Sequence, residues 1–129
     1  MVAYSFRPRF IAPIRSGEKR QTIRKVGLKR HALPGEKLQL YAGMRTKHCE
    51  KIAEAVCMEL QQIEISPAAH GTIMIKLDKA PWLYPDELEA FARADGFASP
   101  TDMRNFWLQN HGADHFYGVV IMWGDIALP

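Results

Sequence analysis

An almost unbroken apolar run near the end of the chain, residues 117–123, most constrains the fold that this sequence can adopt. Valine, isoleucine, methionine and aromatic residues follow one another there, which is typical of a central strand of a sheet. A central strand needs partner strands elsewhere in the chain and other elements to cover it. The sequence must therefore supply a sheet before this last strand.

Earlier segments supply the candidate strands. Residues 21–24 and 37–41 alternate between apolar and polar types, as half-buried strands do. Residues 51–60 fit either a strand or a helix, and the β-rich surroundings favour a strand. Residues 62–65 and 72–77 are two more short β-prone runs. The loop 66–71 between them, which contains Pro67 and Gly71, predicts a hairpin.

Helical patterns lie between these runs and the last strand. Residues 86–94 have apolar side chains at helical spacing, and Asp95-Gly96 predicts the end of that helix. Ser99, Pro100 and Asp102 predict the start of a second helix, which continues to residues 110–112. Residues 10–14 predict a short helical turn that Ser16-Gly17 ends. Strands, a helical insertion and a final strand predict an α+β, barrel-like fold in a single domain, residues 1–129.

Charge is distributed unevenly along the chain. Residues 1–51 contain 13 Lys and Arg against 3 Asp and Glu, whereas residues 52–129 contain 4 against 11. Such asymmetry indicates an anionic partner for the N-terminal half, with nucleic acid or a nucleotide as the usual candidates. The alternative is two solvated faces of opposite sign that attract each other within the fold.

The sequence gives little support to a membrane, secreted or metal-binding protein. No apolar run is long enough to span a membrane, and the first residues lack the apolar segment of a signal peptide, so we expect a cytoplasmic protein. Two cysteines are expected to be reduced and structural. His48, Cys49, Cys57 and His70 form no Cys-x-x-Cys pair and no His-x-x-x-His pair on a predicted helix. His111 and His115 are four residues apart, but Gly112 and Asp114 intervene at a predicted helix end, so no metal and no cofactor are expected.

The run from Gly17 to Arg24 places an amine, a hydroxyl and a guanidinium within a few residues of one another. In a strand, alternation puts Thr22 and Arg24 on one face and turns Ile23 toward the core. Lys19, in the preceding turn, can lean over the face of Thr22 and Arg24. The run therefore predicts a basic, polar pocket at the edge of the sheet.

This run resembles the Gly-x-Lys-x-x-Thr-[Ile/Val]-Arg signature of the ASCH domains, a family with a PUA-like fold. The turn into a strand at residues 34–38 is similar to the family's Gly-Asp-x-Leu segment, and the late helical insertion around residues 96–97 and 102–103 also matches. The resemblance covers most of the chain. It implies a small PUA-like (ASCH) β-barrel with flanking and inserted helices.

Some small bacterial ASCH proteins are amidohydrolases that remove the acetyl group from N4-acetylcytidine. The resemblance implies that Thr22 is the nucleophile, that Lys19 activates it, and that Asp102 takes the place of the family's catalytic glutamate. Asp102 carries a side chain about one methylene shorter than that glutamate. An ordinary lysine has a pKa of about 10.4, which desolvation and cationic neighbours must lower before the amine can act as a base.

Other ASCH proteins bind RNA or have been linked to RNA cleavage, so an RNA-binding module or a ribonuclease is the alternative. The expected partner is then single-stranded RNA instead of a nucleoside-like small molecule. The oligomeric state is left open. Six residues are predicted to bind the substrate or nucleic acid: Arg24, Arg20, Arg7, Arg9, Arg45 and Tyr41. Lys29, Arg30 and Lys47 add to the cations that favour RNA.

Overall fold

One strongly curved sheet forms the framework of the computed structural model, which describes residues 1–68 and 71–129. The strands pair in the order β1-β3-β4-β6-β2, and β5 pairs with the end of β4. Only β1 and β3 are parallel, and every other pair is antiparallel. The strands are β1 (Val2–Phe6), β2 (Gln21–Lys25), β3 (Lys37–Ala42), β4 (Glu50–Ser66), β5 (Met74–Leu77) and β6 (Phe116–Trp123).

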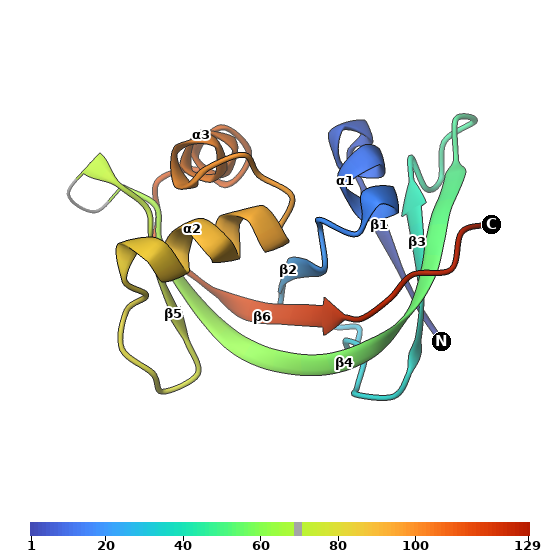
Figure 1. Cartoon of the computed structure of the whole chain (residues 1–129), viewed down its shortest axis with the longest axis horizontal. Coiled ribbons are helices and arrows are strands. Elements are labelled where there is room, and N and C mark those ends of the chain that lie inside the picture. The colour runs from blue at the N-terminus through green and yellow to red at the C-terminus, as the bar shows by residue number, and fades with distance from the viewer. Residues whose placement is uncertain (69–70) are drawn as a thin grey trace.

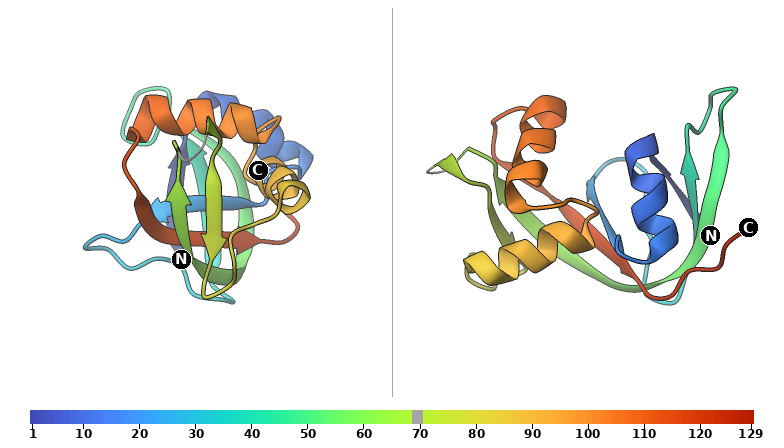
Figure 2. Two further views of the ribbon diagram at one scale, coloured as in Figure 1. Left: turned by 90° about the vertical axis from the view of Figure 1, so that its left-hand side faces the viewer. Right: turned by 45° about the horizontal axis from the view of Figure 1, so that its top comes forward.

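The helices lie on the concave side of this sheet (Figures 1 and 2). They are the 3-10 helix η1 (Pro8–Phe10) and the α-helices α1 (Ile11–Ser16), α2 (Pro85–Ala94) and α3 (Pro100–His111). In Figure 1, α1 lies over one end of the sheet and α2 and α3 over the other, with β2 between them. None of the described helices is long and apolar enough to cross a membrane.

Strand β4 explains the curvature. It is 17 residues long, pairs with β3 through its first half and with β6 and β5 through its second. Its pairing shifts register between Cys57 and Glu59, and such bulges bend a strand and increase its twist. The bend lets one continuous strand serve both ends of the sheet, as Figure 1 shows.

The sheet does not close into a barrel among the described residues, because its edge strands β1 and β2 do not pair with each other. A side chain bridges them instead: Arg24 Nη2 on β2 donates a hydrogen bond of 2.8 Å to the carbonyl oxygen of Ser5 on β1. The predicted α+β fold is thus confirmed, with an open, curved sheet in place of a closed barrel.

Most elements agree with the sequence-based predictions. Gly17 ends α1 in the left-handed conformation, at a φ of 83°. Ser99 caps α3 by accepting a hydrogen bond from the Asp102 N–H. Residues 51–60 are a strand, and the predicted hairpin forms from the end of β4 and β5. Its loop includes Ala69 and His70, which lie outside the described residues.

Two details differ from those predictions. Residues 51–60 and 62–65 belong to one strand, because polar Gln61 and Gln62 stay in register with β6. Burial along β2 also differs from simple alternation, since Thr22 is buried whereas Ile23 packs against the core as predicted but is only half-buried. Thr22 lies on the side that the helices cover, so the covered face of β2 is polar.

Gly118 allows β2 and β6 to approach each other closely. A Cβ atom at this position would lie 2.5 Å from the Arg24 carbonyl oxygen and 2.7 Å from the Phe116 ring. We expect Gly118→Ala to lower the free energy of unfolding by about 1–3 kcal/mol, the usual cost of overpacking. Urea denaturation measures this loss. Gly27→Ala is the matched control, because a Cβ there meets nothing within 4 Å; equal losses in both variants would contradict the close approach.

Candidate active site

A cavity of about 350 Å³ lies between α3 and η1, with β2 along its floor. Lys19, Thr22, Arg24 and Asp95 contribute polar groups, and aromatic side chains form much of the wall. These residues come from β1, η1, β2, α3, β6 and the connections around α1 and α2. The cavity therefore brings together residues that lie far apart in the sequence.

The backbone around Lys19 is fixed by three elements. Its N–H donates to the Pro13 carbonyl of α1 at 2.9 Å. The next N–H, of Arg20, donates to the Ala94 carbonyl at the end of α2 at 2.7 Å, and the Arg20 carbonyl accepts from the Trp123 N–H of β6 at 2.9 Å. The short link between α1 and β2 is thus attached to α1, α2 and β6 at once.

The Lys19 side chain is buried and held at its tip. Only 3% of the residue is exposed, and Nζ donates to the Asp95 carbonyl oxygen at 2.5 Å and lies 3.6 Å from the Asp95 carboxylate. Nζ also lies 4.6 Å from the centre of the Phe10 ring, a cation–π distance. Gly96 makes room for the stem, since a Cβ there would lie 2.8 Å from Lys19 Cδ.

Burial changes the proton affinity of both members of this pair. Burial lowers the pKa of Lys19 to about 8; the Asp95 carboxylate opposes that shift, and the positive charge of Arg24 adds to it. Burial likewise raises the pKa of Asp95, against the influence of Lys19 and Gln21. An amine with a pKa near 8 is partly neutral at physiological pH, so Lys19 can accept a proton.

Thr22 and Arg24 share one face of β2, as predicted. Arg24 Nε donates to Thr22 Oγ1 at 3.0 Å, so the hydroxyl is oriented by a guanidinium. The guanidinium itself lies 5.0 Å from the centres of both the Tyr4 and the Phe6 rings. Arg24 forms no ion pair with a carboxylate of the described residues, although its charge is largely buried.

Aromatic rings form the wall opposite β2. Phe10, Phe97 and Phe106 contact one another with ring centres 5.2–5.5 Å apart. Trp107 and Phe116 continue the wall, and the buried indole N–H of Trp107 has no hydrogen-bond partner among the described residues. Such a wall suits a flat, apolar ligand surface.

Asp102 lies outside this cavity. Its carboxylate pairs with Arg9 at 2.8 Å and accepts a hydrogen bond from the Ala98 N–H at 3.0 Å. Burial alone would raise the pKa of Asp102, but these hydrogen bonds lower it on balance. The carboxylate beside Lys19 is that of Asp95, which the sequence analysis treated only as a helix end.

The other predicted binding residues are dispersed. Arg7 lines the cavity, and Arg9 packs behind its aromatic wall, 5.0 Å from the Phe97 ring centre. Arg20 instead borders a separate hollow with Arg15, and neither Tyr41 nor Arg45 lines the cavity. In the described part of the chain, histidine, cysteine and acidic side chains form no group of three or more that could hold a metal ion. His70 lies outside that part.

Solved structures of ASCH proteins share this fold. The crystal structure of ASCH from Zymomonas mobilis has a TM-score of 0.56 and 16% sequence identity, and the match covers 98% of this chain and 68% of that one. Two single-residue variants of the same protein match with TM-scores of 0.54 and 0.51, at 17% and 18% identity. No family model and no curated protein matches the sequence. The comparison confirms the predicted ASCH, PUA-like fold.

The buried pair leads to a prediction about stability. In Asp95→Asn the Lys19 ammonium loses the one carboxylate near it among the described residues, so we expect the free energy of unfolding to fall by about 3–5 kcal/mol at pH 7. Without the carboxylate the pKa of Lys19 should fall below its wild-type value of about 8, so the amine becomes neutral at a lower pH in the variant. The loss should therefore shrink as pH rises to about 8 and stay small above it, where Lys19 is neutral in both folded proteins. Urea denaturation at pH 7 and pH 10 measures both effects.

The double variant Lys19→Met with Asp95→Asn supplies the control for this experiment. It removes both charges together, so its stability should return to that of the wild type or exceed it. A double variant as unstable as Asp95→Asn alone would show that the charges are not the cause.

Proposed function

We propose that this chain, which shares the fold of the ASCH proteins, is an amidohydrolase that removes the acyl group from an N-acylated nucleobase or nucleoside of the N4-acetylcytidine type. The observation that carries the proposal is a buried lysine amine with a pKa of about 8 in the same cavity as a threonine hydroxyl. Amide hydrolysis by a hydroxyl needs such a base, because threonine is otherwise unreactive at neutral pH.

In the first half of the proposed reaction, neutral Lys19 Nζ takes the proton of Thr22 Oγ1 as that oxygen bonds to the acyl carbon. The negative charge that develops on the carbonyl oxygen is stabilised by the guanidinium of Arg24, which already donates to Thr22 Oγ1. The C–N bond then breaks, and the leaving amine takes the proton from the Lys19 ammonium. Thr22 is left as an acyl ester.

Water completes the cycle. Lys19 takes a proton from a water molecule as the water oxygen bonds to the acyl carbon, and the C–O bond to Thr22 breaks. The proton returns to Thr22 Oγ1, and the carboxylic acid leaves. Asp95 holds Lys19 in place through its carbonyl oxygen and carboxylate, so it acts here as a positioning residue. The shifts in pKa of Lys19 and Asp95 fit this division of roles.

The aromatic wall supports a nucleobase as the acylated group. Bases are flat and stack on aromatic rings, and Phe106, Trp107 and Phe116 supply such rings in the cavity. The polar floor of Thr22 and Arg24 lies across from this wall. A base held between them would present its exocyclic amide to Thr22.

RNA binding is the second candidate function. It is supported by Arg7 and Lys25, which are exposed and line the same cavity, so a strand could enter it and bring phosphates to both. An RNA-binding module would lose affinity steeply with added salt as counterions are released. Hydrolysis of a neutral nucleoside would depend little on salt.

Hydrolysis of N4-acetylcytidine tests the proposal. We expect the wild type to release cytidine, and Lys19→Ala and Thr22→Ala each to lower kcat/KM by about 10² or more, because each removes the nucleophile or its base. Chromatography of the released cytidine measures the rate. Lys47→Ala, an exposed lysine in the β3–β4 connection, is the control and should keep wild-type activity. A wild type without turnover would overturn the assignment to this substrate.

The same assay tests whether Asp95 or Asp102 acts on Lys19. Asp95→Asn should lower kcat and shift the pH profile, because it changes the proton affinity of Lys19. Asp102→Asn should leave the pH profile unchanged, because its carboxylate contacts Arg9 and the Ala98 N–H instead. The opposite result would restore Asp102 to the catalytic group.

The pH dependence of kcat/KM follows from the lowered pKa of Lys19. Lys19 must be neutral to accept the proton of Thr22, so the rate should rise as pH increases through about 8 and level off above it. The charged groups that act on the amine are Asp95, Arg24 and Arg9, and their net effect is part of that value. A rate that falls through pH 8 would instead make Lys19 a proton donor.

A further inference from the structure

The cavity has an exposed end that the proposed reaction does not use. Arg7 follows β1, Lys25 ends β2 and His111 ends α3; all three line the cavity and all three are exposed. Lys19, Thr22 and Asp95 lie at the opposite, buried end, each no more than 5% exposed. The cavity thus has a buried reactive end and a basic mouth.

Positive charge predominates along the whole cavity. Its lining includes the cations Lys19, Arg24, Arg7 and Lys25 but a single carboxylate, that of Asp95, which is committed to Lys19 and Gln21. Among the described residues, neither Arg7 nor Lys25 forms an ion pair. Arg24, whose charge is largely buried, also lacks a carboxylate partner among the described residues, and an unpaired buried charge is costly. A concave wall in addition focuses the field of the exposed cations Arg7 and Lys25. The cavity is therefore matched to a ligand that brings negative charge.

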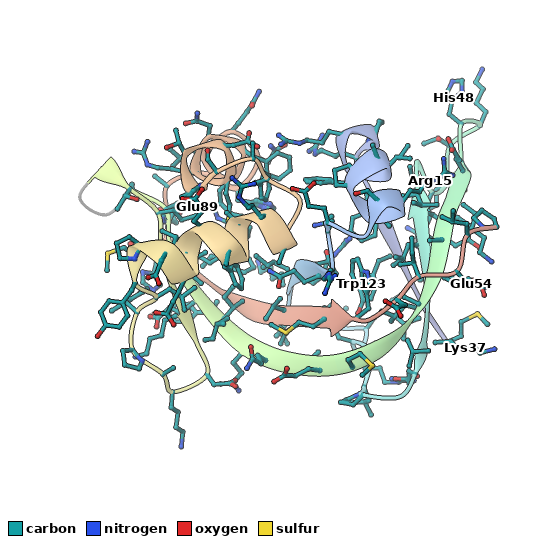
Figure 3. The ribbon with its side chains drawn as sticks, viewed as in Figure 1. Arg15, Lys37, His48, Glu54, Glu89 and Trp123 are labelled. Atoms are coloured by element: carbon teal, nitrogen blue, oxygen red, sulfur yellow. The ribbon has the colours of Figure 1, made fainter. Side chains whose placement is uncertain are left out.

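Four cations elsewhere in the N-terminal half form ion pairs, whereas five others form none among the described residues: Arg20, Lys29, Lys37, Arg45 and Lys47. Arg9 pairs with Asp102, Arg15 with Glu50, Arg30 with Glu36 and Lys51 with Glu54. Figure 3 shows Arg15 and His48 near the β3–β4 end of the molecule, away from α2 and α3. The charge excess of residues 1–51 is thus partly neutralised within the fold. What remains at the cavity is a local basic mouth.

We propose that the cavity takes a nucleoside 5′-monophosphate, with its base between the aromatic wall and β2 and its phosphate at Arg7 and Lys25. This inference rests on the proposed function for the identity of the base and adds the charged group that the substrate carries. A volume of about 350 Å³ lies at the lower end of small-molecule sites, which suits one nucleotide and not a run of stacked bases. Phosphate bound by arginine and lysine gains charge-assisted hydrogen bonds that a free nucleoside lacks.

His111 offers a local probe of the phosphate. Although His111 is exposed overall, one side of its ring packs against Trp107, with the two ring centres 4.3 Å apart, and this partial burial together with the charge of Arg7 lowers the pKa of the imidazole in the free protein. A dianionic phosphate beside Arg7 and Lys25 would favour the charged imidazole and raise that pKa again. A neutral nucleoside in the same cavity would not.

The test compares binding of cytidine and cytidine 5′-monophosphate, so it requires no turnover. Calorimetry at fixed ionic strength should show the monophosphate binding about tenfold or more tightly than cytidine. In the double variant Arg7→Gln with Lys25→Gln this preference should disappear, so that cytidine and its monophosphate bind with similar affinity. The double variant Lys37→Gln with Lys47→Gln is the control, because it removes the same charge from exposed positions that do not line the cavity. Nuclear magnetic resonance should show the pKa of His111 rising with the monophosphate only.

Several outcomes would overturn the inference. Equal affinities for cytidine and its monophosphate would do so, as would equal loss in both double variants. Inorganic phosphate competing as well as the nucleotide would show a general anion site. A cytidine oligonucleotide that binds more tightly than the monophosphate, with a steeper salt dependence, would assign the mouth to RNA. Because hydrolysis is measured separately, an inactive protein that still prefers the monophosphate would contradict only the proposed reaction.

Discussion

The structure of the candidate site depends on one buried ion pair, between Lys19 and Asp95. The pair joins the α1–β2 link to the end of α2, and the same link is attached to β6 through Arg20 and Trp123. Burial lowers the pKa of Lys19 and raises the pKa of Asp95, so it favours the neutral form of each side chain. Either charge without the other would therefore be strongly destabilised at this position. An apolar pair of similar size would pack here at less cost. A charged pair in such a place therefore costs stability, and the proposed role of Lys19 as a base would account for its presence.

Arg24 connects the candidate site to the edge of the sheet. It bridges β1 and β2 where a barrel would have closed, and it orients Thr22 with the same guanidinium. The same side chain thus lies at the opening of the sheet and in the polar floor of the cavity, where it supplies one hydrogen bond between β1 and β2 instead of a row of backbone hydrogen bonds. Because Arg24 remains charged at any working pH, it keeps the cavity positive whatever the protonation state of Lys19.

Sequence patterns within a few residues predicted most helices and strands of this fold. The residues that meet at the candidate site depend instead on contacts between distant parts of the chain. The Ser99 cap, the Gly17 helix end and the shared face of Thr22 and Arg24 depend on neighbours within a few residues, so the sequence pattern predicted them. The contact between Lys19 and Asp95 joins positions 76 apart, and no local pattern distinguishes such an aspartate from a helix end. Asp102 matched the family's carboxylate in order along the chain, but it lies at a helix start, where its carboxylate accepts from the Ala98 N–H and pairs with Arg9 outside the cavity. The single signal for Asp95 was the Asp-Gly pair, which also frees the space for Lys19.

Asp102 and Arg9 explain how the aromatic wall keeps its shape. Their ion pair joins η1 to the start of α3, on either side of the rings of Phe10, Phe97 and Phe106. An exposed ion pair alone contributes little, about 0–1 kcal/mol. Arg9, however, also lies 5.0–5.4 Å from the centres of all three rings, so the pair and the ring contacts hold the same geometry together. A wall held in this way needs no ligand to form, which reduces the ordering that a flat ligand would otherwise require on binding. The two aspartates thus have different structural roles: Asp102 helps to hold the aromatic wall in place through Arg9, and Asp95 holds the Lys19 amine in the cavity.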